Sequence, residues 1–379
     1  MFIGRGYSSP QEAASDMVTV ERMGEADAAS IVAKLLETGP DWKSLVELLH
    51  YFWKVKTVVE GREYGIMEEV DFVTDTIKLD FEQYLMPENL IDRITRSEEG
   101  GRDLLKNLIK MGLIEGEEYD RVVVCPKCGS FKVRVKLVCP HCKSFKVTPT
   151  RLIQHVICGY SGPEAEFKKG DEKICPSCNA KVVKEGVDYI VLGRIFYCED
   201  CKRIFKNPKI IFECGNKETL AHEPGFQFEP INSNYVGLKR YKITDKGVEL
   251  IESGELLIDV IAAYAKELKP GIEVYKREET MSLEELNPEI RRLGFSIVLK
   301  NPDTNKIVAV DFATSDLVPF IMKATILKNA GNITYFLLST PTILDKVVSL
   351  NSYASGANII DITDHSLREI AEITLKELE

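Results

Sequence analysis

The sequence has no uninterrupted apolar run of about 18 residues, the length that a membrane-spanning helix needs. Its first residues, Met1-Phe-Ile-Gly-Arg-Gly-Tyr7, also lack the apolar segment of a secretion signal. It contains no Gly-x4-Gly-Lys-Ser/Thr phosphate loop and no Ser/His/Asp arrangement with an elbow motif. We therefore expect a cytoplasmic protein without a membrane partner, and neither a phosphate-loop NTPase nor a serine hydrolase.

Histidine is scarce, with 5 in 379 residues, yet three of the five stand among the cysteines: His141, His155 and His222. All 10 cysteines lie between Cys125 and His222, and the spacing makes His155 and His222 the candidate ligands beside them. In chain order they form five pairs with two intervening residues, which we number one to five, and two single ligands: Cys125/Cys128, Cys139/Cys142, His155/Cys158, Cys175/Cys178, Cys198/Cys201, then Cys214 and His222. Because the chain has no secretion signal, such pairs favour metal binding over disulfides.

The number of these residues indicates the kind of metal site. Zinc in structural sites takes four ligands in a tetrahedron, and thiolate and imidazole are among its preferred donors. The twelve candidate ligands therefore make three closed zinc sites and leave no thiol over. With all four positions filled at each site, we expect the three zinc ions to stabilise the fold and not to activate water.

The spacing leaves two partitions of the ligands open. Both place pairs four and five in one site, because the 19 residues between them are enough for two strands and a turn. The sequential partition joins pair one to pair two. The ten residues between these pairs, Gly129–Val138, have the pattern of a single β run, into which a hairpin is hard to fit.

The nested partition, which the spacing favours, joins pair two to pair three and closes pair one with Cys214 and His222. It requires a helix from Pro149 towards Val156, so that His155 and Cys158 lie on one face at i and i+3. Within pair two, His141 competes as a ligand.

The charge of the chain is unevenly distributed. The net charge of −10 argues against a general nucleic-acid coat, but residues 121–207 hold 17 lysines and arginines against eight acids, about +9, and the flanks carry about −19. The basic strands of this segment predict nucleic-acid contacts by Lys132, Arg134, Lys136, Lys143, Lys146, Lys168 and Lys169. Candidates for stacking on bases are Phe131, Phe145 and Tyr160. The alternative is that the lysines balance the thiolates, since zinc with four thiolates carries −2.

Hydrophobic patterns divide the chain into five segments. Residues 1–24 contain a Gly/Ser/Pro stretch and are expected to be poorly ordered. Helical periodicity predominates over 25–118, which fits either a winged helix or a generic helical bundle. A multi-zinc domain of short strands follows over 119–228, and 229–253 forms a connector. Strands and helices alternate over 254–379. The expected fold class is multidomain α+β, with a helical N-terminal region, a central β-rich zinc-ribbon-type domain and a C-terminal α/β domain.

Four stretches of the middle third carry a distinctive pattern. They are Leu-Ile-Gln-His-Val-Ile-Cys-Gly-Tyr-Ser-Gly-Pro-Glu-Ala-Glu-Phe over 152–167, Cys-Pro-Ser-Cys over 175–178, Asp-Tyr-Ile-Val-Leu-Gly-Arg-Ile-Phe-Tyr-Cys-Glu-Asp-Cys over 188–201, and Phe-Lys-Asn-Pro over 205–208. This pattern resembles the thaumarchaeal output domain, an archaeal multi-zinc module. The resemblance implies a regulatory role in signalling or transcription. That family closes the domain with a Cys-x2-Cys pair, whereas Gly-Asn-Lys follows Cys214 here, so His222 becomes the candidate last ligand.

The order of elements over 254–379 resembles the restriction-endonuclease-like fold. That resemblance implies an acid at the start of the first hairpin strand and an acid-x-Lys triplet on the second, which bind Mg²⁺ and activate water. Asp311-Phe-Ala313 occupies the triplet, so Ala313 replaces the lysine, and no acid stands near Gly294-Phe295. We therefore expect a degenerate, non-catalytic version used for dimerisation or docking, with Asp311 as the one catalytic candidate. A receiver-type doubly wound domain is a rival interpretation, although only Asp311 meets its requirements.

Together these patterns predict an archaeal zinc-dependent regulatory protein that binds nucleic acid and is not catalytic. Two alternatives stay open. One is a Mg²⁺-dependent nuclease centred on Asp311, and the other is a protein–protein signalling adaptor, which the acidic flanks favour. A homo-oligomer would form through the C-terminal domain.

Overall fold

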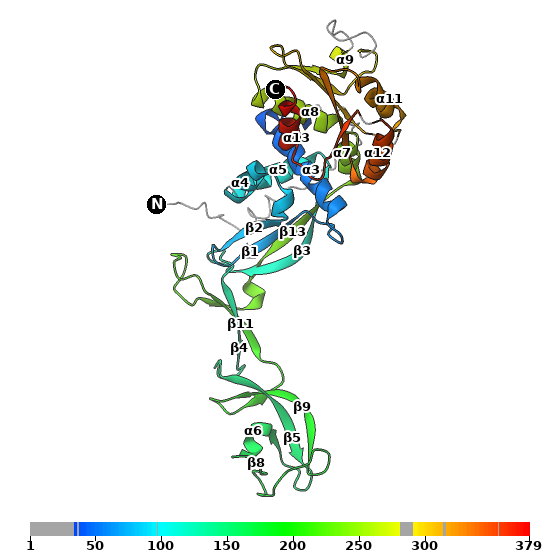
Figure 1. Cartoon of the computed structure of the whole chain (residues 1–379). Coiled ribbons are helices and arrows are strands. Elements are labelled where there is room, and N and C mark those ends of the chain that lie inside the picture. The colour runs from blue at the N-terminus through cyan, green and yellow to red at the C-terminus, as the bar shows by residue number, and fades with distance from the viewer. Residues whose placement is uncertain (1–33, 36–37, 97, 281–290, 314–315, 355) are drawn as a thin grey trace. The chain divides into compact units, whose positions relative to one another are not determined.

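The computed structural model describes residues 34–35, 38–96, 98–280, 291–313, 316–354 and 356–379 (Figure 1). The expectation of poor order for 1–24 lies outside these residues. The described residues form two compact units. Unit 1 holds 70–76 and 121–237, and unit 2 holds the described parts of 15–69, 77–120 and 238–379. None of the described helices is long and apolar enough to cross a membrane.

The N-terminal part of the chain combines helices with a four-stranded sheet. Its elements are α3 (Trp42–Val58), β1 (Ile66–Asp71), β2 (Thr76–Phe81), α4 (Glu88–Arg96), α5 (Glu98–Lys110), β3 (Ile114–Val124) and β13 (Asn234–Ile243), with one-turn helices at Gly39–Asp41 and Gln83–Leu85. The strand order is β2-β1-β13-β3. The predicted helices are present, but β1 and β2 were missed. In β2, Ile77, Leu79 and Phe81 alternate with charged residues, which is the period of a half-buried strand.

The C-terminal part is an α/β domain, as the sequence predicts. Its elements are α7 (Asp245–Glu252), α8 (Glu255–Leu268), β14 (Glu273–Lys276), α9 (Arg277–Thr280), β15 (Ile297–Lys300), β16 (Ile307–Phe312), α11 (Val318–Leu327), β17 (Ile333–Ser339), α12 (Pro341–Ala354), β18 (Asn358–Asp361) and α13 (Leu367–Lys376). The strand order is β14-β15-β16-β17-β18. The first three strands pair antiparallel, and β16, β17 and β18 pair parallel.

Helix α3 shares one hydrophobic core with the C-terminal helices of unit 2. Its residues Leu45 to Val55 are buried together with side chains of α8 and α13. The buried carboxylate of Glu47 accepts hydrogen bonds from Tyr264 Oη at 2.6 Å and from Asn89 Nδ2 at 2.9 Å. Burial raises the pKa of Glu47 above its ordinary value. The carboxylate of Glu47 is therefore paired inside the core and not turned towards a ligand.

Unit 1 is built from short antiparallel sheets. Its elements are β4 (Val133–Val138), β5 (Val147–His155), β6 (Ser161–Pro163), α6 (Glu164–Phe167), β7 (Lys168–Lys169), β8 (Glu172–Lys173), β9 (Tyr189–Cys198), β10 (Ile204–Phe205), β11 (Lys209–Cys214), β12 (Gln227–Phe228) and a one-turn helix at Pro230–Asn232. Three sheets result, in the orders β12-β11-β4, β10-β9-β5-β6 and β7-β8. The helical, β-rich and α/β regions occur in the predicted order, so the expected fold class is confirmed.

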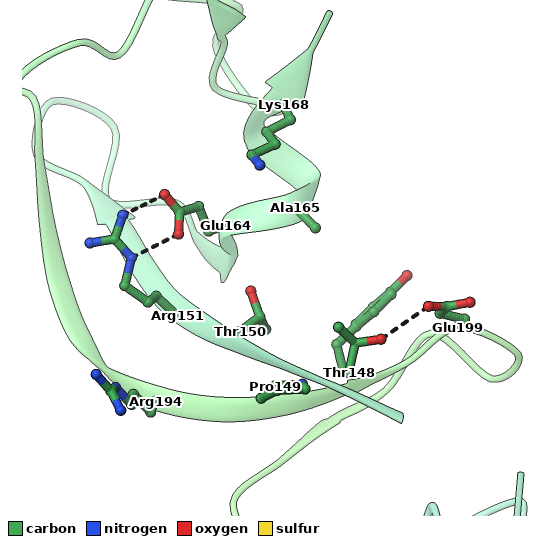
Figure 2. Close-up of a pocket in the computed structure, with 10 residues that line it drawn as sticks. Thr148, Pro149, Thr150, Arg151, Glu164, Ala165, Lys168, Arg194 and Glu199 are labelled. Carbon is green, nitrogen blue, oxygen red and sulfur yellow. Dashed lines mark hydrogen bonds and ion pairs between the residues drawn. The ribbon is translucent and has the colours of Figure 1, made fainter. Parts of the chain in front are cut away.

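The longest element pair of unit 1 is the ribbon of β5 and β9. It runs from the pair Val147↔Cys198 to the pair His155↔Tyr189. The register shifts by one residue opposite Leu152 and Ile153, so Leu192 of β9 is an extra, bulged residue. On the side of α6, Glu164 accepts hydrogen bonds from both Nε and Nη2 of Arg151, at 2.7 and 2.6 Å (Figure 2). This two-point ion pair fastens α6 to the ribbon.

Candidate metal centres

The five ligand pairs share one backbone turn. In each, the N–H of the first ligand residue donates to the carbonyl five residues later, and the N–H four residues later donates back to the first residue. In pair one, these are Cys125 N–H to Ser130 O at 3.0 Å and Gly129 N–H to Cys125 O at 2.9 Å. The residue four positions after the first ligand has a left-handed backbone in every pair: Gly129, Lys143, Gly159, Asn179 and Lys202.

His155 belongs to such a turn and not to a helix. The N–H of Gly159 donates to the carbonyl of His155 at 2.9 Å, as the turn requires. The predicted helix from Pro149 towards Val156 is therefore wrong, because this segment is strand β5 and pairs with β9. The signal that sequence reasoning missed was Gly159, which follows Cys158 as Gly129 follows pair one.

The ligands come together as three clusters. Within each cluster the candidate ligand atoms all lie within 4.8 Å of one another. The clusters are cluster 1 (Cys125, Cys128, Cys214 and His222), cluster 2 (Cys139, Cys142, Cys198 and Cys201) and cluster 3 (His155, Cys158, Cys175 and Cys178). All twelve predicted ligands are therefore used, four in each cluster.

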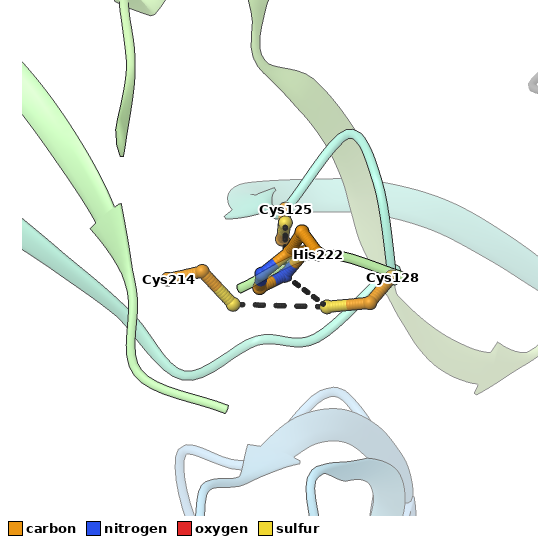
Figure 3. Close-up of side chains that lie close together, drawn as sticks. All are labelled: Cys125, Cys128, Cys214 and His222. Carbon is orange, nitrogen blue, oxygen red and sulfur yellow. Dashed lines mark hydrogen bonds between the residues drawn. The ribbon is translucent and has the colours of Figure 1, made fainter. Parts of the chain in front are cut away.

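Cluster 1 brings Cys125 and Cys128 together with Cys214 and His222, which lie more than 80 residues later in the chain (Figure 3). The sulfurs of Cys128 and Cys214 lie 3.6 Å apart. His222 Nε2 lies 3.5 Å from the sulfur of Cys125 and 3.3 Å from that of Cys128. Its other ring nitrogen, Nδ1, lies 2.8 Å from the carbonyl oxygen of Glu223 and can donate to it, which leaves Nε2 free for a metal.

Clusters 2 and 3 stand at the two ends of the β5/β9 ribbon. In cluster 2, Sγ–Sγ distances are 3.6 Å between Cys139 and Cys201 and 3.5 Å between Cys142 and Cys198. In cluster 3, His155 Nδ1 lies 3.1 Å from the sulfur of Cys158 and 3.3 Å from that of Cys178, and the sulfurs of Cys158 and Cys175 are 3.6 Å apart. The Nε2 atom of His155 is buried and has no hydrogen-bond partner among the described residues.

The clusters correct the predicted partition of the ligands. Pair one closes with Cys214 and His222, as the nested partition proposed, but pair two joins pair five, and pair three joins pair four. The reason is that β5 is a strand. Pair two precedes β5 and pair five ends β9, so the antiparallel ribbon brings these two pairs together. Pair three ends β5 and pair four precedes β9, so they meet at the opposite end.

The donor sets fit tetrahedral metal ions and not disulfides. All ten cysteines are free thiols. Neighbouring sulfurs stand 3.5 to 3.6 Å apart, whereas a disulfide bond is about 2.05 Å long. A tetrahedron with metal–sulfur bonds of about 2.3 Å has edges of about 3.8 Å, close to these distances. Because each cluster supplies four donors, a bound ion would have no open position for water or substrate.

Backbone N–H groups around the sulfurs of cluster 2 favour the thiolate of Cys198. Hydrogen bonds from the N–H groups of Cys201 and Asp200, against a contribution from burial, lower the pKa of Cys198 to about 7. The N–H of Ser144 favours the thiolate of Cys142, but burial and the neighbouring sulfurs outweigh it and raise the pKa of Cys142 to about 12. The second thiol therefore keeps its proton until a cation compensates the charge.

Four of the seven predicted nucleic-acid contacts are engaged within the protein. Arg134 and Lys136 of β4 both form ion pairs with Glu213, which is 9% exposed. The Nζ of Lys132 donates to a backbone carbonyl at 3.2 Å, and Lys146 pairs with an aspartate at 3.2 Å. These cations therefore stabilise unit 1 before any ligand arrives.

The other three predicted contacts are exposed. They are Lys143, Lys168 and Lys169, and none has an ion-pair partner among the residues that the structure describes. The structure adds Arg194, Lys202 and Lys206, which are also exposed and have no ion pair within the described part of the chain. Sequence reasoning missed these three, although Lys202 follows pair five directly, as Lys143 follows pair two.

A shallow groove of about 650 Å³ runs along the β5/β9 ribbon beside α6 (Figure 2). Three of its lining residues, Arg151, Lys168 and Arg194, carry a positive charge. The full lining is Thr148, Pro149, Thr150, Arg151, Glu164, Ala165, Lys168, Arg194, Tyr197 and Glu199. Glu164 is paired with Arg151, and Glu199 accepts a hydrogen bond from Thr148 at 3.0 Å. Both acids of the groove are therefore engaged, while Lys168 and Arg194 remain available to an anion.

Asp311, the catalytic candidate, is buried and fully engaged. Its Oδ1 accepts hydrogen bonds from the N–H and the hydroxyl of Ser296, at 2.8 and 3.0 Å. Its Oδ2 accepts from Lys323 Nζ at 2.8 Å and from Tyr335 Oη at 2.9 Å. Asp311 is 2% exposed, so its carboxylate faces protein donors on both oxygens and anchors α11 to the sheet.

The family model described as thaumarchaeal output domain 1 matches residues 68–233. The resemblance of the middle third to this family is thus confirmed. The match begins in β1 and includes β2, α4 and α5, so it extends further upstream than the cysteine pattern indicated. No curated protein and no solved structure matches the chain.

Proposed function

We propose that this chain is a regulatory protein whose unit 1 binds nucleic acid and depends on three structural Zn²⁺ ions. The support for zinc is the donor chemistry, because two clusters offer three thiolates and one imidazole and the third offers four thiolates. All four positions at each ion would be taken by side chains. The ions would therefore hold the turns and strands of unit 1 in place and supply no catalytic water.

The observation that carries the proposal is a positive charge that survives metal binding. Between Arg121 and His222 the chain has 19 lysines and arginines and ten acids, a surplus of nine. Three Zn²⁺ ions on ten thiolates and two neutral imidazoles contribute minus four, which leaves about +5. The thiolates therefore account for less than half of the surplus, although the whole chain carries −10.

The unpaired cations define where the nucleic acid would lie. Lys168 and Arg194 line the groove of the ribbon, Lys143 and Lys202 stand in the ligand turns of cluster 2, and Lys206 follows β10. Phosphate contacts made by such exposed cations release counterions and weaken steeply with salt. The proposed contacts therefore keep the exposed Lys143, Lys168 and Lys169. Arg194, Lys202 and Lys206 replace the four predicted contacts that are engaged within the protein.

Salt-dependent binding tests this proposal. We expect fluorescence anisotropy with a labelled oligonucleotide to give a log Kd that changes with log salt by about 4 to 5 for six phosphate contacts. Replacing Lys168 and Lys169 by Ala should reduce that slope, and Lys266→Ala, at an exposed lysine of α8, is the matched control. Native mass spectrometry would first establish that the chain holds three zinc ions. If that chain binds no oligonucleotide, or binds it independently of salt, the proposal is refuted.

The contacts of Asp311 disfavour the nuclease alternative. A carboxylate that already accepts from Ser296, Lys323 and Tyr335 would have to lose these partners to hold Mg²⁺. We therefore propose that the C-terminal domain does not cleave nucleic acid. Cleavage in the presence of Mg²⁺ or Mn²⁺ that Asp311→Ala abolishes would establish the opposite.

For the C-terminal domain we propose pairing with a second copy of the chain. The outer face of α11 exposes Val318, Met322 and Ile326 at 62, 57 and 41%, and these positions are four residues apart along the helix. The helix has no acidic residue, and its one cation, Lys323, is buried. An uncharged apolar stripe is a surface on which two negatively charged copies can meet without repulsion. The free thiols further lead us to propose a reducing compartment, as in the cytoplasm.

A further inference from the structure

The two turns of cluster 2 carry a lysine at a position where the other three ligand turns carry glycine or asparagine. Lys143 and Lys202 occupy the left-handed site, with φ of 61° and 62°. The other three turns have Gly129, Gly159 and Asn179 there, which are the residues that adopt this conformation at little cost. Both lysines thus stand in a strained backbone conformation at the same metal cluster. Backbone strain that is kept at one site points to a role for the side chains.

The turns of cluster 2 expose two cations beside sulfurs that are only partly buried. Cys139 and Cys198 are buried, Cys142 is exposed and Cys201 is half-buried, while Lys143 and Lys202 are exposed. The Nζ of Lys202 lies 5.9 Å from the centroid of the Tyr197 ring, a residue that also lines the groove of the ribbon. Lys202 therefore adjoins the groove and offers a positive charge to a ligand that follows the ribbon.

The acids of this surface are already engaged. Asp200 accepts from Ser144 Oγ at 2.6 Å and pairs with Lys146, and Glu199 accepts from Thr148. Neither acid forms an ion pair with Lys143 or Lys202 in the part of the chain that the structure describes.

The exposed aromatic ring of Phe145 lies between Lys143 and Lys146 in the sequence. Phe145 is 71% exposed, with Lys143 two residues before it and Lys146 directly after it. The matching residue after pair one, Phe131, is half-buried, and its N–H is held by Asp75 Oδ1 at 2.7 Å. The third stacking candidate, Tyr160, packs on Phe167 and donates to Glu166. Of the three predicted stacking residues, Phe145 therefore has its ring free for a ligand.

We infer that the surface of cluster 2 binds single-stranded nucleic acid, with Phe145 stacked on a base and Lys143 and Lys202 on neighbouring phosphates. This inference rests on the proposed function and names its ligand class. Unpaired bases expose their faces to an aromatic ring, whereas the bases of a duplex are stacked on one another. The phenyl ring of Phe145 should therefore favour single-stranded nucleic acid over a duplex, and the lysines should supply the salt-dependent part of the affinity.

Two variants of the full-length, zinc-loaded protein test the inference against a labelled oligothymidine and a duplex of the same length. Phe145→Ser should raise the Kd for the single strand roughly 5- to 150-fold, the range measured for lost base stacking, and leave duplex affinity unchanged. Its matched control is Tyr84→Ser in unit 2, where the tyrosine is 72% exposed. The control should change neither affinity.

The double variant Lys143→Gly/Lys202→Gly separates binding from folding. Glycine relieves the left-handed backbone, so the variant should keep three zinc ions and melt no lower than the parent chain. Its single-strand affinity should nevertheless fall, with a salt slope smaller by about 1.4 for two lost phosphate contacts. Asn179→Gly, which makes the same backbone change at cluster 3 without losing a charge, should bind like the parent chain.

The outcomes distinguish this inference from the proposed function. Equal affinity for single strand and duplex, with no effect of Phe145→Ser, overturns the inference while nucleic-acid binding stands. Equal affinity for a polyglutamate peptide also overturns it, because the surface would then bind any polyanion. If neither nucleic acid binds the zinc-loaded chain, the proposed function fails and the inference fails with it.

Discussion

Removal of the metal ions should unfold unit 1 and leave unit 2 folded. The buried apolar groups of unit 1 are few, and the metal ligands are among them. The group at cluster 3 is Ile153, Phe167, Cys175, Val182 and Tyr189, and the group at cluster 1 is Cys125, Phe212, Cys214 and Phe228. Unit 2 has instead a large core with residues from Leu35 to Leu378, and two smaller apolar clusters beside it in the C-terminal domain. Its stability therefore needs no metal.

The expected magnitude is large. A structural zinc site in a small domain contributes about 10–16 kcal/mol of apparent folding free energy at pH 7. A typical domain is stable by about 5–15 kcal/mol in total, so the loss of a single ion is enough to unfold the strands that it joins. Because β5 and β9 have a cluster at each end, loss of either cluster 2 or cluster 3 frees one end of the ribbon.

Hydrogen exchange measured by mass spectrometry checks this prediction. After treatment with a zinc chelator under reducing conditions, amides of β5 and β9 should exchange within seconds, while amides of α3 and α8 stay protected. Cys175→Ser should produce the same local exchange around cluster 3 without a chelator, and Ser177→Ala in the same turn should not. If elemental analysis finds no metal and β5 and β9 remain protected, the reasoning is refuted.

Three further predictions concern charges and the C-terminal domain. Lys323→Met should lower the free energy of unfolding in urea by about 3–5 kcal/mol, because it leaves the buried Asp311 carboxylate without its cation. Adding Asp311→Leu to this variant should restore much of that free energy. An equal loss in the single and the double variant would contradict the prediction. Zinc affinity should rise with pH, because the pKa of Cys142 is raised to about 12 and the ion must displace its proton. Calorimetry in buffers of different ionisation enthalpy would measure that proton release. Met322→Glu should make the chain monomeric in light scattering, and a parent chain that is already monomeric would rule out pairing through α11.

The sequence predicts the ligands better than their partners. A Cys-x2-Cys pair is a local signal, and the turn that holds it closes within six residues. Which pairs meet depends on strand pairing between residues about 50 apart, such as Val147 and Cys198. Because the segment before His155 was predicted to be a helix, pair two was assigned to pair three and pair four to pair five. In the structure, pair two joins pair five and pair three joins pair four. The left-handed position of Gly159 was the local sign that a turn of the cysteine kind ends β5.

The charged residues show a second limit of sequence reasoning. Arg134, Lys136 and Lys143 look alike in the sequence, but the first two face Glu213 on β11, about 80 residues away, and the third faces no acid among the described residues. Likewise, Asp311 matches a catalytic position by pattern, while Lys323, twelve residues later on α11, occupies its Oδ2. Whether a charge is available to a ligand depends on long-range neighbours that no local pattern contains.

The bulge at Leu192 has a consequence for the lengths of the two strands. Because a metal cluster lies at each end of the ribbon, β5 and β9 must span the same distance. β9 spans it with ten residues and β5 with nine. Removing one residue from the middle of β5 would turn His155 to the opposite face, since side chains alternate along a strand. Removing Leu192 instead would leave both flanking pairs aligned. A deletion in the ribbon should therefore be tolerated at the bulge and excluded elsewhere in β5 and β9.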